Sequence, residues 1–204
     1  MRTTVSSALS TQHSALSFRL CRFDPAFAAL VVSWVPDAGD LFKLTPTTPP
    51  PLTAEKVIGW TRAGGNPLVL VRGDSAIPCA YAELNPMRTN EEHLWIGHVV
   101  VDPAMRGQGI GRTFVRKLVE CGFQTLGAER ISLIVLPGNE PAIRCYQAAG
   151  FELRAEEYHR FGAARRRCRM LRFELDRPRP AGSPPPVSGQ HLRSIAQSLR
   201  APQF

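Results

Sequence analysis

Short blocks of apolar and polar residues alternate along most of the chain, and their period predicts the secondary structure. A period of two, or a short run that is wholly apolar, is typical of a β-strand. Such segments predict seven strands, at residues 18–23, 67–72, 77–85, 93–101, 131–136, 151–160 and 167–175. An apolar stripe at helical spacing that includes Ile110, Phe114 and Leu118 predicts a long amphipathic helix over residues 109–126.

Three shorter helices are predicted where a good capping residue borders an apolar stretch, at residues 24–34, 53–60 and 140–149. The proline-rich residues 37–52 are predicted to form an irregular connection. Because helices and strands alternate in this order, we expect an α+β, sandwich-like fold with one central mixed sheet.

Composition divides the chain into three parts. The 204 residues are 44% hydrophobic, which suits one globular domain, and we predict that domain at residues 18–176. Residues 1–17 and the proline- and arginine-rich residues 177–204 hold too few large apolar side chains to order themselves, so both are predicted to be disordered. A targeting peptide is the alternative for the first segment. The apolar runs are far shorter than the ~20 residues of a membrane span, so no membrane segment is expected.

The formal net charge of +8 is concentrated near the C-terminus, where residues 152–204 carry eleven arginines and five acidic residues. Neither a recognition-helix pattern nor an aromatic platform accompanies them, so nucleic-acid binding is not expected. These arginines form either a solvated surface or one that meets an anionic partner. The five cysteines are scattered and never spaced as Cys-x-x-Cys, so we expect no zinc or other metal site, reduced thiols and a cytoplasmic location.

A glycine-rich turn between a predicted strand and the long helix is the most informative stretch, Val99-Val-Val-Asp-Pro-Ala-Met-Arg-Gly-Gln-Gly-Ile-Gly111. Glycine lets the backbone approach a ligand closely, and the free amides and dipole of the following helix favour a phosphate. Two flanking arginines can add charge-assisted contacts. The turn predicts a phosphate or pyrophosphate site made by Arg106, Gly107, Gln108, Gly109, Ile110, Gly111 and Arg112.

Two other phosphate-binding motifs fit this turn less well. A dinucleotide fingerprint needs Gly-x-Gly-x-x-Gly after the first strand of a βαβ unit, whereas this chain has Gly107-x-Gly109-x-Gly111 in its middle. A Walker loop needs Gly-Lys-Ser/Thr, which is absent from the sequence. A plain glycine-rich helix start is the remaining alternative.

Two motifs of the chain resemble those of the GCN5-related N-acetyltransferase (GNAT) superfamily. The acetyl-CoA motif Gln/Arg-x-x-Gly-x-Gly/Ala is matched by Arg106, Gly109 and Gly111. The motif Asn-x-x-Ala-x-x-x-Tyr-x-x-x-Gly-Phe is matched by Asn139, Ala142, Tyr146, Gly150 and Phe151, in a form most similar to the branch of ribosomal-protein alanine acetyltransferases. The resemblance covers about residues 18–175. It implies a mixed, mostly antiparallel sheet of about seven strands with about four helices, splayed between the fourth and fifth strands.

The resemblance also implies the reaction partners, acetyl-CoA as co-substrate and a primary amine of a small molecule or protein as acceptor. It places the pantetheine arm in the splay, near Val99, Val100, Val101 and Asn139, where backbone amides would stabilise a tetrahedral intermediate. Tyr146 is the candidate general acid, because a phenol with a pKa of about 10 suits a thiol leaving group. Packing against the cofactor is its alternative role.

No motif identifies the general base, and three residues are candidates: Glu83, Glu92 and His98. Solvent is a fourth possibility. A histidine suits deprotonation near neutral pH. Because His98 alternates with Val99 and Val101, the face that it occupies depends on whether the strand is bulged.

The leading hypothesis is therefore an acetyl-CoA-dependent N-acetyltransferase that acts as a monomer or homodimer. A noncatalytic acyl-CoA-binding or regulatory module is the alternative from another class. Cys145 lies beside the candidate acid, but no activating histidine lies near it in the sequence, so it is not expected to be a nucleophile.

Overall fold

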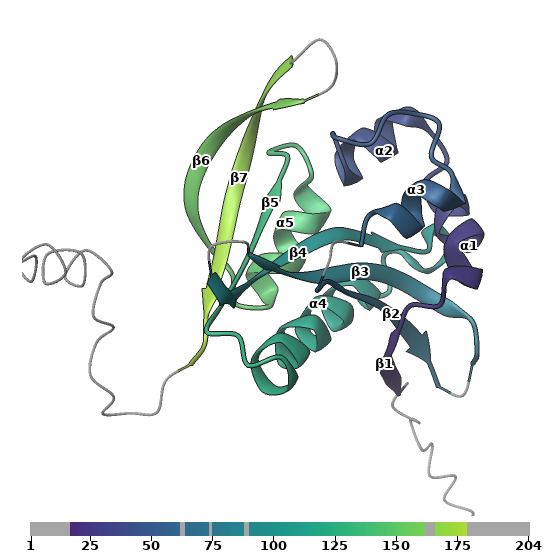
Figure 1. Ribbon diagram of the computed structural model, residues 1–204, viewed down its shortest axis with the longest axis horizontal. Helices are drawn as coiled ribbons and strands as arrows, with labels where there is room; N and C mark the ends of the chain where they lie inside the picture. The colour runs from purple at the N-terminus through teal and green to yellow at the C-terminus, as the bar shows by residue number, and fades with distance from the viewer. Residues whose placement is uncertain (1–16, 62–63, 74, 88–89, 162–165, 179–204) are drawn as a thin grey trace, which may run out of the picture.

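A mixed sheet of seven strands forms the centre of the protein, as a computed structural model shows (Figure 1). The structure describes residues 17–61, 64–73, 75–87, 90–161 and 166–178. The spatial order is β1-β2-β3-β4-β5-β7-β6, and all neighbours are antiparallel except β4 and β5. The strands are β1 (Phe18–Arg22), β2 (Asn66–Arg72), β3 (Pro78–Met87), β4 (Asn90–Val101), β5 (Arg130–Val135), β6 (Glu152–Phe161) and β7 (Arg166–Asp176). The predicted fold class is confirmed.

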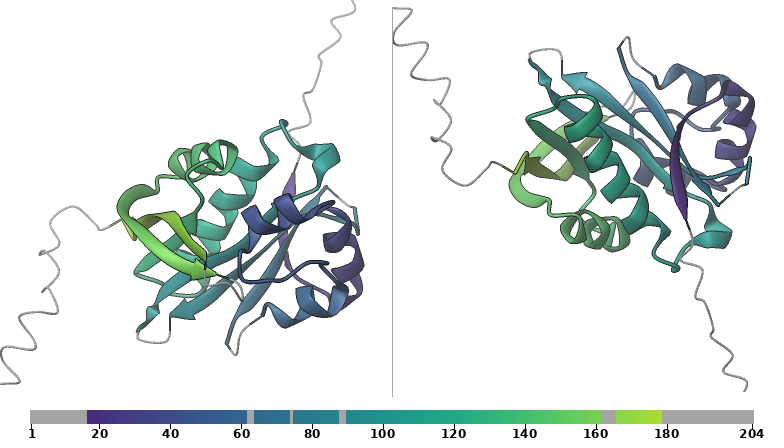
Figure 2. Two further views of the ribbon diagram at one scale, coloured as in Figure 1. Left: turned by 90° about the horizontal axis from the view of Figure 1, so that it is seen from above. Right: turned by 90° about the horizontal axis from the view of Figure 1, so that it is seen from below.

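Helices cover both faces of the sheet and enclose two hydrophobic cores (Figures 1 and 2). The helices are α1 (Ala28–Ser33), α2 (Ala38–Leu44), α3 (Ala54–Gly59), α4 (Ile110–Glu120) and α5 (Glu140–Ala148), with short turns η1 (Pro25–Phe27), η2 (Pro103–Met105) and the π-helical η3 (Cys121–Thr125). One core joins α4 and α5 to the sheet, and the other joins α1, α2 and α3 to it. Successive side chains of β2 point to opposite faces of the sheet and so contribute to both cores: Leu68 and Leu70 face the first core, and Val69 and Val71 face the second.

Two predicted elements differ from the structure. The irregular connection predicted at residues 37–52 was wrong over α2, where the Asp37 carboxylate caps the helix by accepting from the Asp40 amide at 2.8 Å. The long helix predicted over residues 109–126 is α-helical only to Glu120 and then widens into η3. There Gly122 packs so tightly that a Cβ would lie 2.7 Å from Cδ1 of Ile131.

The sheet opens between β4 and β5, as predicted. These parallel strands pair over only three residues of each strand, from His93–Arg130 to Trp95–Ser132. Beyond that point β4 stays paired with β3 as far as Val101, and β5 stays paired with β7 as far as Val135. The two halves of the sheet therefore diverge and leave the second half of β4 with an open edge. We call this gap the split.

The two terminal segments predicted to be disordered lie almost wholly outside the described residues. At the start of the described part, the Ser17 carbonyl accepts from the Gly73 amide at 2.7 Å. At its end, Arg177 donates to the Ala128 carbonyl at 2.8 Å and to the Phe123 carbonyl. No helix among the described residues is both long and apolar enough to cross a membrane.

Candidate active site

The glycine-rich turn forms an open cradle at the start of α4. Gly107 and Gly109 have φ angles of 76° and 79°, in the left-handed region that favours glycine. A Cβ built on either residue would meet no atom within 4 Å, so the backbone here is accessible. Ile110, only 4% exposed, anchors the first turn of α4 in the core. The free amides of this turn are therefore presented outward, as phosphate binding requires.

The other cradle residues have different roles. At Gly111 a Cβ would lie 3.2 Å from Sγ of Cys145, so this glycine lets α4 pack closely on α5. Arg112 is exposed, and Gln108 donates to the Ala104 carbonyl at 3.3 Å. Burial raises the pKa of the Cys145 thiol, although nearby arginine charges partly oppose this effect. A raised pKa disfavours the thiolate that a nucleophilic cysteine needs.

Arg106 fastens the end of β4 to α1. Its Nε donates to the Val101 carbonyl at 3.1 Å, and its Nη2 donates to the Trp34 carbonyl at 3.2 Å. The guanidinium is thus engaged by backbone oxygens beside the cradle, a contact that the sequence did not predict. Of the two arginines expected to flank a phosphate, Arg112 is the one whose guanidinium makes no hydrogen bond with the described residues.

The second half of β4 directs backbone groups into the split. The Asp102 amide donates to the Cys79 carbonyl on β3 at 2.9 Å. Because the bonding direction alternates along an antiparallel pair, the amide and carbonyl of Val101 point away from β3. The same alternation turns Val99 toward the split and Val100 toward β3. Of the backbone predicted to face the cofactor at residues 99–101, that of Val99 and Val101 therefore lies on the open edge of β4, whereas that of Val100 is turned toward β3.

Asn139 precedes α5, and Tyr146 lies on the last turn of that helix. Asn139 is the N-cap by position, but its side chain makes no capping hydrogen bond. Tyr146 is 7% exposed and packs edge-to-face on Phe151, with ring centroids 6.1 Å apart. Burial, with a smaller contribution from Cys145, raises the pKa of the Tyr146 phenol above its usual value. No hydrogen bond among the described residues involves its hydroxyl, so the group is protonated and unpaired within the described part of the chain.

A β-bulge places His98 on the same face as Glu83. Tyr81 pairs with Val100 and Glu83 pairs with Gly97, so two steps along β3 correspond to three along β4. Nδ1 of His98 lies 2.8 Å from Oε2 of Glu83 and 3.1 Å from Oε1. The imidazole also stacks on Trp60, with centroids 4.2 Å apart and planes 4° apart. The sequence left the face of His98 open, and the bulge decides it.

Glu83 is fully buried and bonded by three side chains. Besides His98, the Tyr81 hydroxyl donates to Oε1 at 2.6 Å and Nδ2 of Asn85 donates to Oε2 at 3.3 Å. Burial by itself raises the pKa of Glu83, but the bonds and charge of His98, with the other two donors, outweigh it and hold the pKa below its ordinary value. Burial and the adjacent Glu83 charge raise the pKa of Tyr81. The carboxylate is therefore ionised.

The third base candidate lies elsewhere. Glu92 is exposed near the start of β4, before the short stretch that pairs with β5. Tyr81 and Asn85 were not predicted as site residues, although a signal was present in the sequence. With Glu83 they alternate along one strand, so all three polar side chains share one face. Such a run on a buried strand indicates a hydrogen-bonded network.

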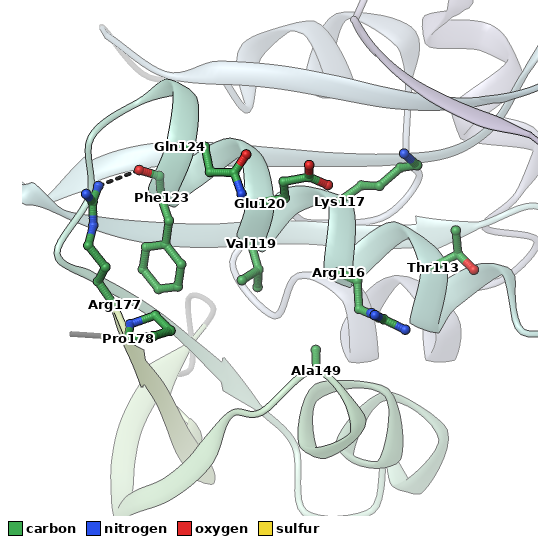
Figure 3. Close-up of a pocket in the computed structure, with 10 residues that line it drawn as sticks. All are labelled: Thr113, Arg116, Lys117, Val119, Glu120, Phe123, Gln124, Ala149, Arg177 and Pro178. Carbon is green, nitrogen blue, oxygen red and sulfur yellow. Dashed lines mark hydrogen bonds between the residues drawn. The ribbon is translucent and has the colours of Figure 1, made fainter. Parts of the chain in front are cut away.

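A separate cleft of about 790 Å³ lies along the outer side of α4 and contains none of the predicted site residues (Figure 3). Thr113, Arg116, Lys117 and Glu120 project from the helix toward it, and Arg177 closes one end through its bond to the Phe123 carbonyl. Among the residues that the structure describes, no group of three or more His, Cys, Asp or Glu side chains could hold a metal ion.

Sequence comparisons match this architecture to known proteins. Residues 37–151 match the family described as "Acetyltransferase (GNAT) family". Alpha/beta-tubulin-N-acetyltransferase 9 of Homo sapiens is 32% identical over 77 residues, which cover 36% of this chain and 37% of that protein. Spermidine N(1)-acetyltransferase of Escherichia coli (strain K12) is 28% identical over 105 residues, which cover 50% of this chain and 54% of that protein. The chain thus matches about a third to a half of the length of these curated relatives.

A solved structure shares the fold over most of the chain. The spermidine N-acetyltransferase from Vibrio cholerae, in complex with CoA and spermine, superposes with a TM-score of 0.65. The match covers 78% of this chain and 95% of that chain, at 14% sequence identity. Likeness at this identity concerns the fold alone.

Proposed function

Because the chain belongs to the Acetyltransferase (GNAT) family, we propose that it moves the acetyl group of acetyl-CoA directly to a primary amine of a small molecule, protein or peptide. The observation that carries this proposal is the open cradle beside the split. Gly107 and Gly109 expose helix-start amides suited to a pyrophosphate, and the open edge of β4 begins just before them. A nucleotide-linked thioester needs both features, a phosphate site and an adjoining slot for its arm.

Acetyl-CoA would bind with its pyrophosphate at residues 106–112 and its pantetheine arm in the split. The backbone of Val99 and the amide of Val101 face that arm, and the side chain of Asn139, which makes no capping hydrogen bond in the described part of the chain, is available to it. Amides along this edge would stabilise the oxyanion of the tetrahedral intermediate. No covalent intermediate with the protein is required.

Tyr146 supplies the proton for the departing thiolate in this proposal. Its hydroxyl is protonated because burial raises the pKa, and it is unpaired among the described residues. The sulfur of a bound cofactor would give this hydroxyl a hydrogen-bond partner.

We propose three amines as test acceptors. The motif from Asn139 to Phe151 suggests kinship with ribosomal-protein alanine acetyltransferases, which points to a peptide with an N-terminal alanine. The curated relatives suggest spermidine and a tubulin peptide. We also propose, from the scattered cysteines, a cytoplasmic location, and a monomer or homodimer as the working assembly.

Calorimetric titration with acetyl-CoA and a thiol-release assay with these amines test the proposal. We expect binding and acetyl transfer to at least one probe. Gly109→Glu should abolish binding, because a carboxylate blocks and repels the pyrophosphate. Gly59→Glu is the matched control, since that exposed glycine also has open space around its Cβ position but lies on α3. Equal affinity in both variants would refute the cradle assignment.

The same assay separates the enzyme from the noncatalytic alternative. Tight binding of acetyl-CoA without thiol release across a broad amine panel would identify an acyl-CoA-binding module. Release that depends on the amine, with the acetylated product detected by mass spectrometry, would identify the transferase.

A further inference from the structure

One ring nitrogen of His98 has no partner among the described residues. Nδ1 is bonded to the Glu83 carboxylate, which only accepts hydrogen bonds, so Nδ1 carries a proton. In the neutral ring Nε2 then holds a lone pair, and no hydrogen bond of the described part of the chain uses it. The side chain of His98 is 19% exposed, whereas that of Glu83 is fully buried. The imidazole can therefore receive a proton from a molecule bound beside β4.

His98 adopts this position in a costly backbone conformation. Its φ of 49° makes it the only described residue other than glycine with a positive φ. Such a conformation is unfavourable for a residue with a Cβ and persists only where the surroundings enforce it. The buried carboxylate on one side and the Trp60 ring on the other do so here. Backbone outliers of this kind cluster at functional sites.

The bulge also sets His98 opposite the split. Val99 and Val101 pack against the core on the α4 side, while His98 faces Glu83 and stacks on the residue that follows α3. A thioester held in the split and an amine approaching from the α3 side would thus meet across β4.

We propose that His98 accepts the proton of the acceptor amine, and that Glu83 positions its ring. This inference rests on the proposed acetyl transfer. Glu83 acts through His98 and is a positioning residue, as are Tyr81 and Asn85, which hold the carboxylate in place. The arrangement follows the logic of catalytic triads, in which a buried carboxylate fixes the tautomer of a histidine base.

The proton transfers balance with Tyr146 as the acid. An ammonium acceptor gives one proton to Nε2 of His98, and its nitrogen then bonds to the acetyl carbon. The C–S bond breaks, and the departing thiolate takes the proton of the Tyr146 hydroxyl. The nitrogen loses its second proton, which restores Tyr146, and His98 releases its own proton to solvent. The products are the acetamide, CoA thiol and one proton.

A further acceptor lies beside the pair of His98 and Glu83, which we call the dyad. Gly97 lets the backbone of β4 lie close to the carboxylate, since a Cβ there would be only 3.1 Å from Oε2 of Glu83. Oδ1 of Asn85 is buried without a hydrogen-bond partner, and its orientation is set because Nδ2 donates to Glu83. The ionised carboxylate of Glu83 and the unpaired Oδ1 of Asn85 lie close together, and such a pair of acceptors favours a hydrogen-bond donor that carries positive charge.

The titratable groups that face His98 are Glu83 and Tyr81, both on β3, while the α3 side presents the uncharged Trp60 ring. The pKa of Glu83 lies below its ordinary value and that of Tyr81 above it. Neither group is therefore expected to change its charge between pH 5 and 9. A loss of rate on the acid side within this window would come from neither of them.

Single-turnover rates at saturating acetyl-CoA, measured from pH 5 to 9, test the proposal. His98→Asn tolerates the left-handed backbone but lacks the base, so the rate at pH 7 should fall about 10²–10⁴-fold. Glu83→Gln should move the acid limb to lower pH by about one unit or more, because a neutral amide stabilises the imidazolium less. Glu91→Gln, at an exposed carboxylate near the start of β4, is the control and should match wild type. Calorimetric affinity for acetyl-CoA should be unchanged in all three.

Nitrogen-15 NMR of labelled histidine provides a readout that needs no turnover. In the neutral ring of His98 we expect the proton at Nδ1 and none at Nε2, with this preference reduced in Glu83→Gln. The opposite tautomer would overturn the proposal even in an active enzyme. Wild-type rates and an unchanged acid limb in His98→Asn would also overturn it. Absence of any acetyl transfer by wild type, despite the expected tautomer, would instead refute the proposed function and leave the dyad as a structural pair.

Discussion

Tyr146→Phe tests whether the Tyr146 hydroxyl acts in chemistry or the ring only packs. The side chain is 7% exposed and lies edge-to-face on Phe151, and the variant keeps both the ring and this contact. No hydrogen bond among the described residues is lost, so the free energy of unfolding should change by less than about 1 kcal/mol. If the hydroxyl protonates the thiolate, kcat should fall about 10²–10⁴-fold, or about 3–5 kcal/mol in the barrier.

The KM for acetyl-CoA should barely move, because the lost interaction belongs mainly to the transition state. Single-turnover rates are the proper measurement, since product release often limits kcat. Tyr158→Phe is the matched control: Tyr158 is 57% exposed under the Arg167 guanidinium, so its hydroxyl should not matter. Equal single-turnover rates in Tyr146→Phe and wild type, with normal melting, would remove Tyr146 from the mechanism and leave water as the proton donor.

Three further predictions concern stability. Gly122→Ala should destabilise the fold by about 1–3 kcal/mol in urea titrations, because its Cβ would overlap a buried side chain of β5. The control Gly59→Ala should be neutral or stabilising. Equal urea midpoints of unfolding in the two variants would contradict this prediction. Arg177→Ala should lower the melting temperature, since its guanidinium bonds two backbone carbonyls, and no loss would show that these bonds contribute nothing. The bonds of Arg172 lower the pKa of Glu157, so its stabilisation is present above about pH 4.3 and is lost as the pH falls through the lower folded value. Glu157→Gln should therefore flatten the acid-side loss of stability in pH-dependent melting.

Local features of the sequence were sufficient to predict the elements and the cradle. Strand and helix periods depend on neighbouring residues, so all seven strands were predicted within a few residues of their bounds. The cradle is local too, because Gly107, Gly109 and the start of α4 are contiguous. The helix α2 was missed because its flanking prolines suggested an irregular segment, whereas Asp37 caps it and Leu41 is buried.

Only the tertiary structure decided where the polar side chains meet. The sequence named Glu83, Glu92 and His98 as equal candidates, since nothing local distinguishes them. One extra residue in β4 reverses the face of every side chain beyond it, and strand periodicity does not reveal such a bulge. Likewise, the partners of Arg106 and of the Glu83 carboxylate come from other elements of the fold. Contacts between distant segments depend on strand register and helix packing, which no single segment of the chain encodes.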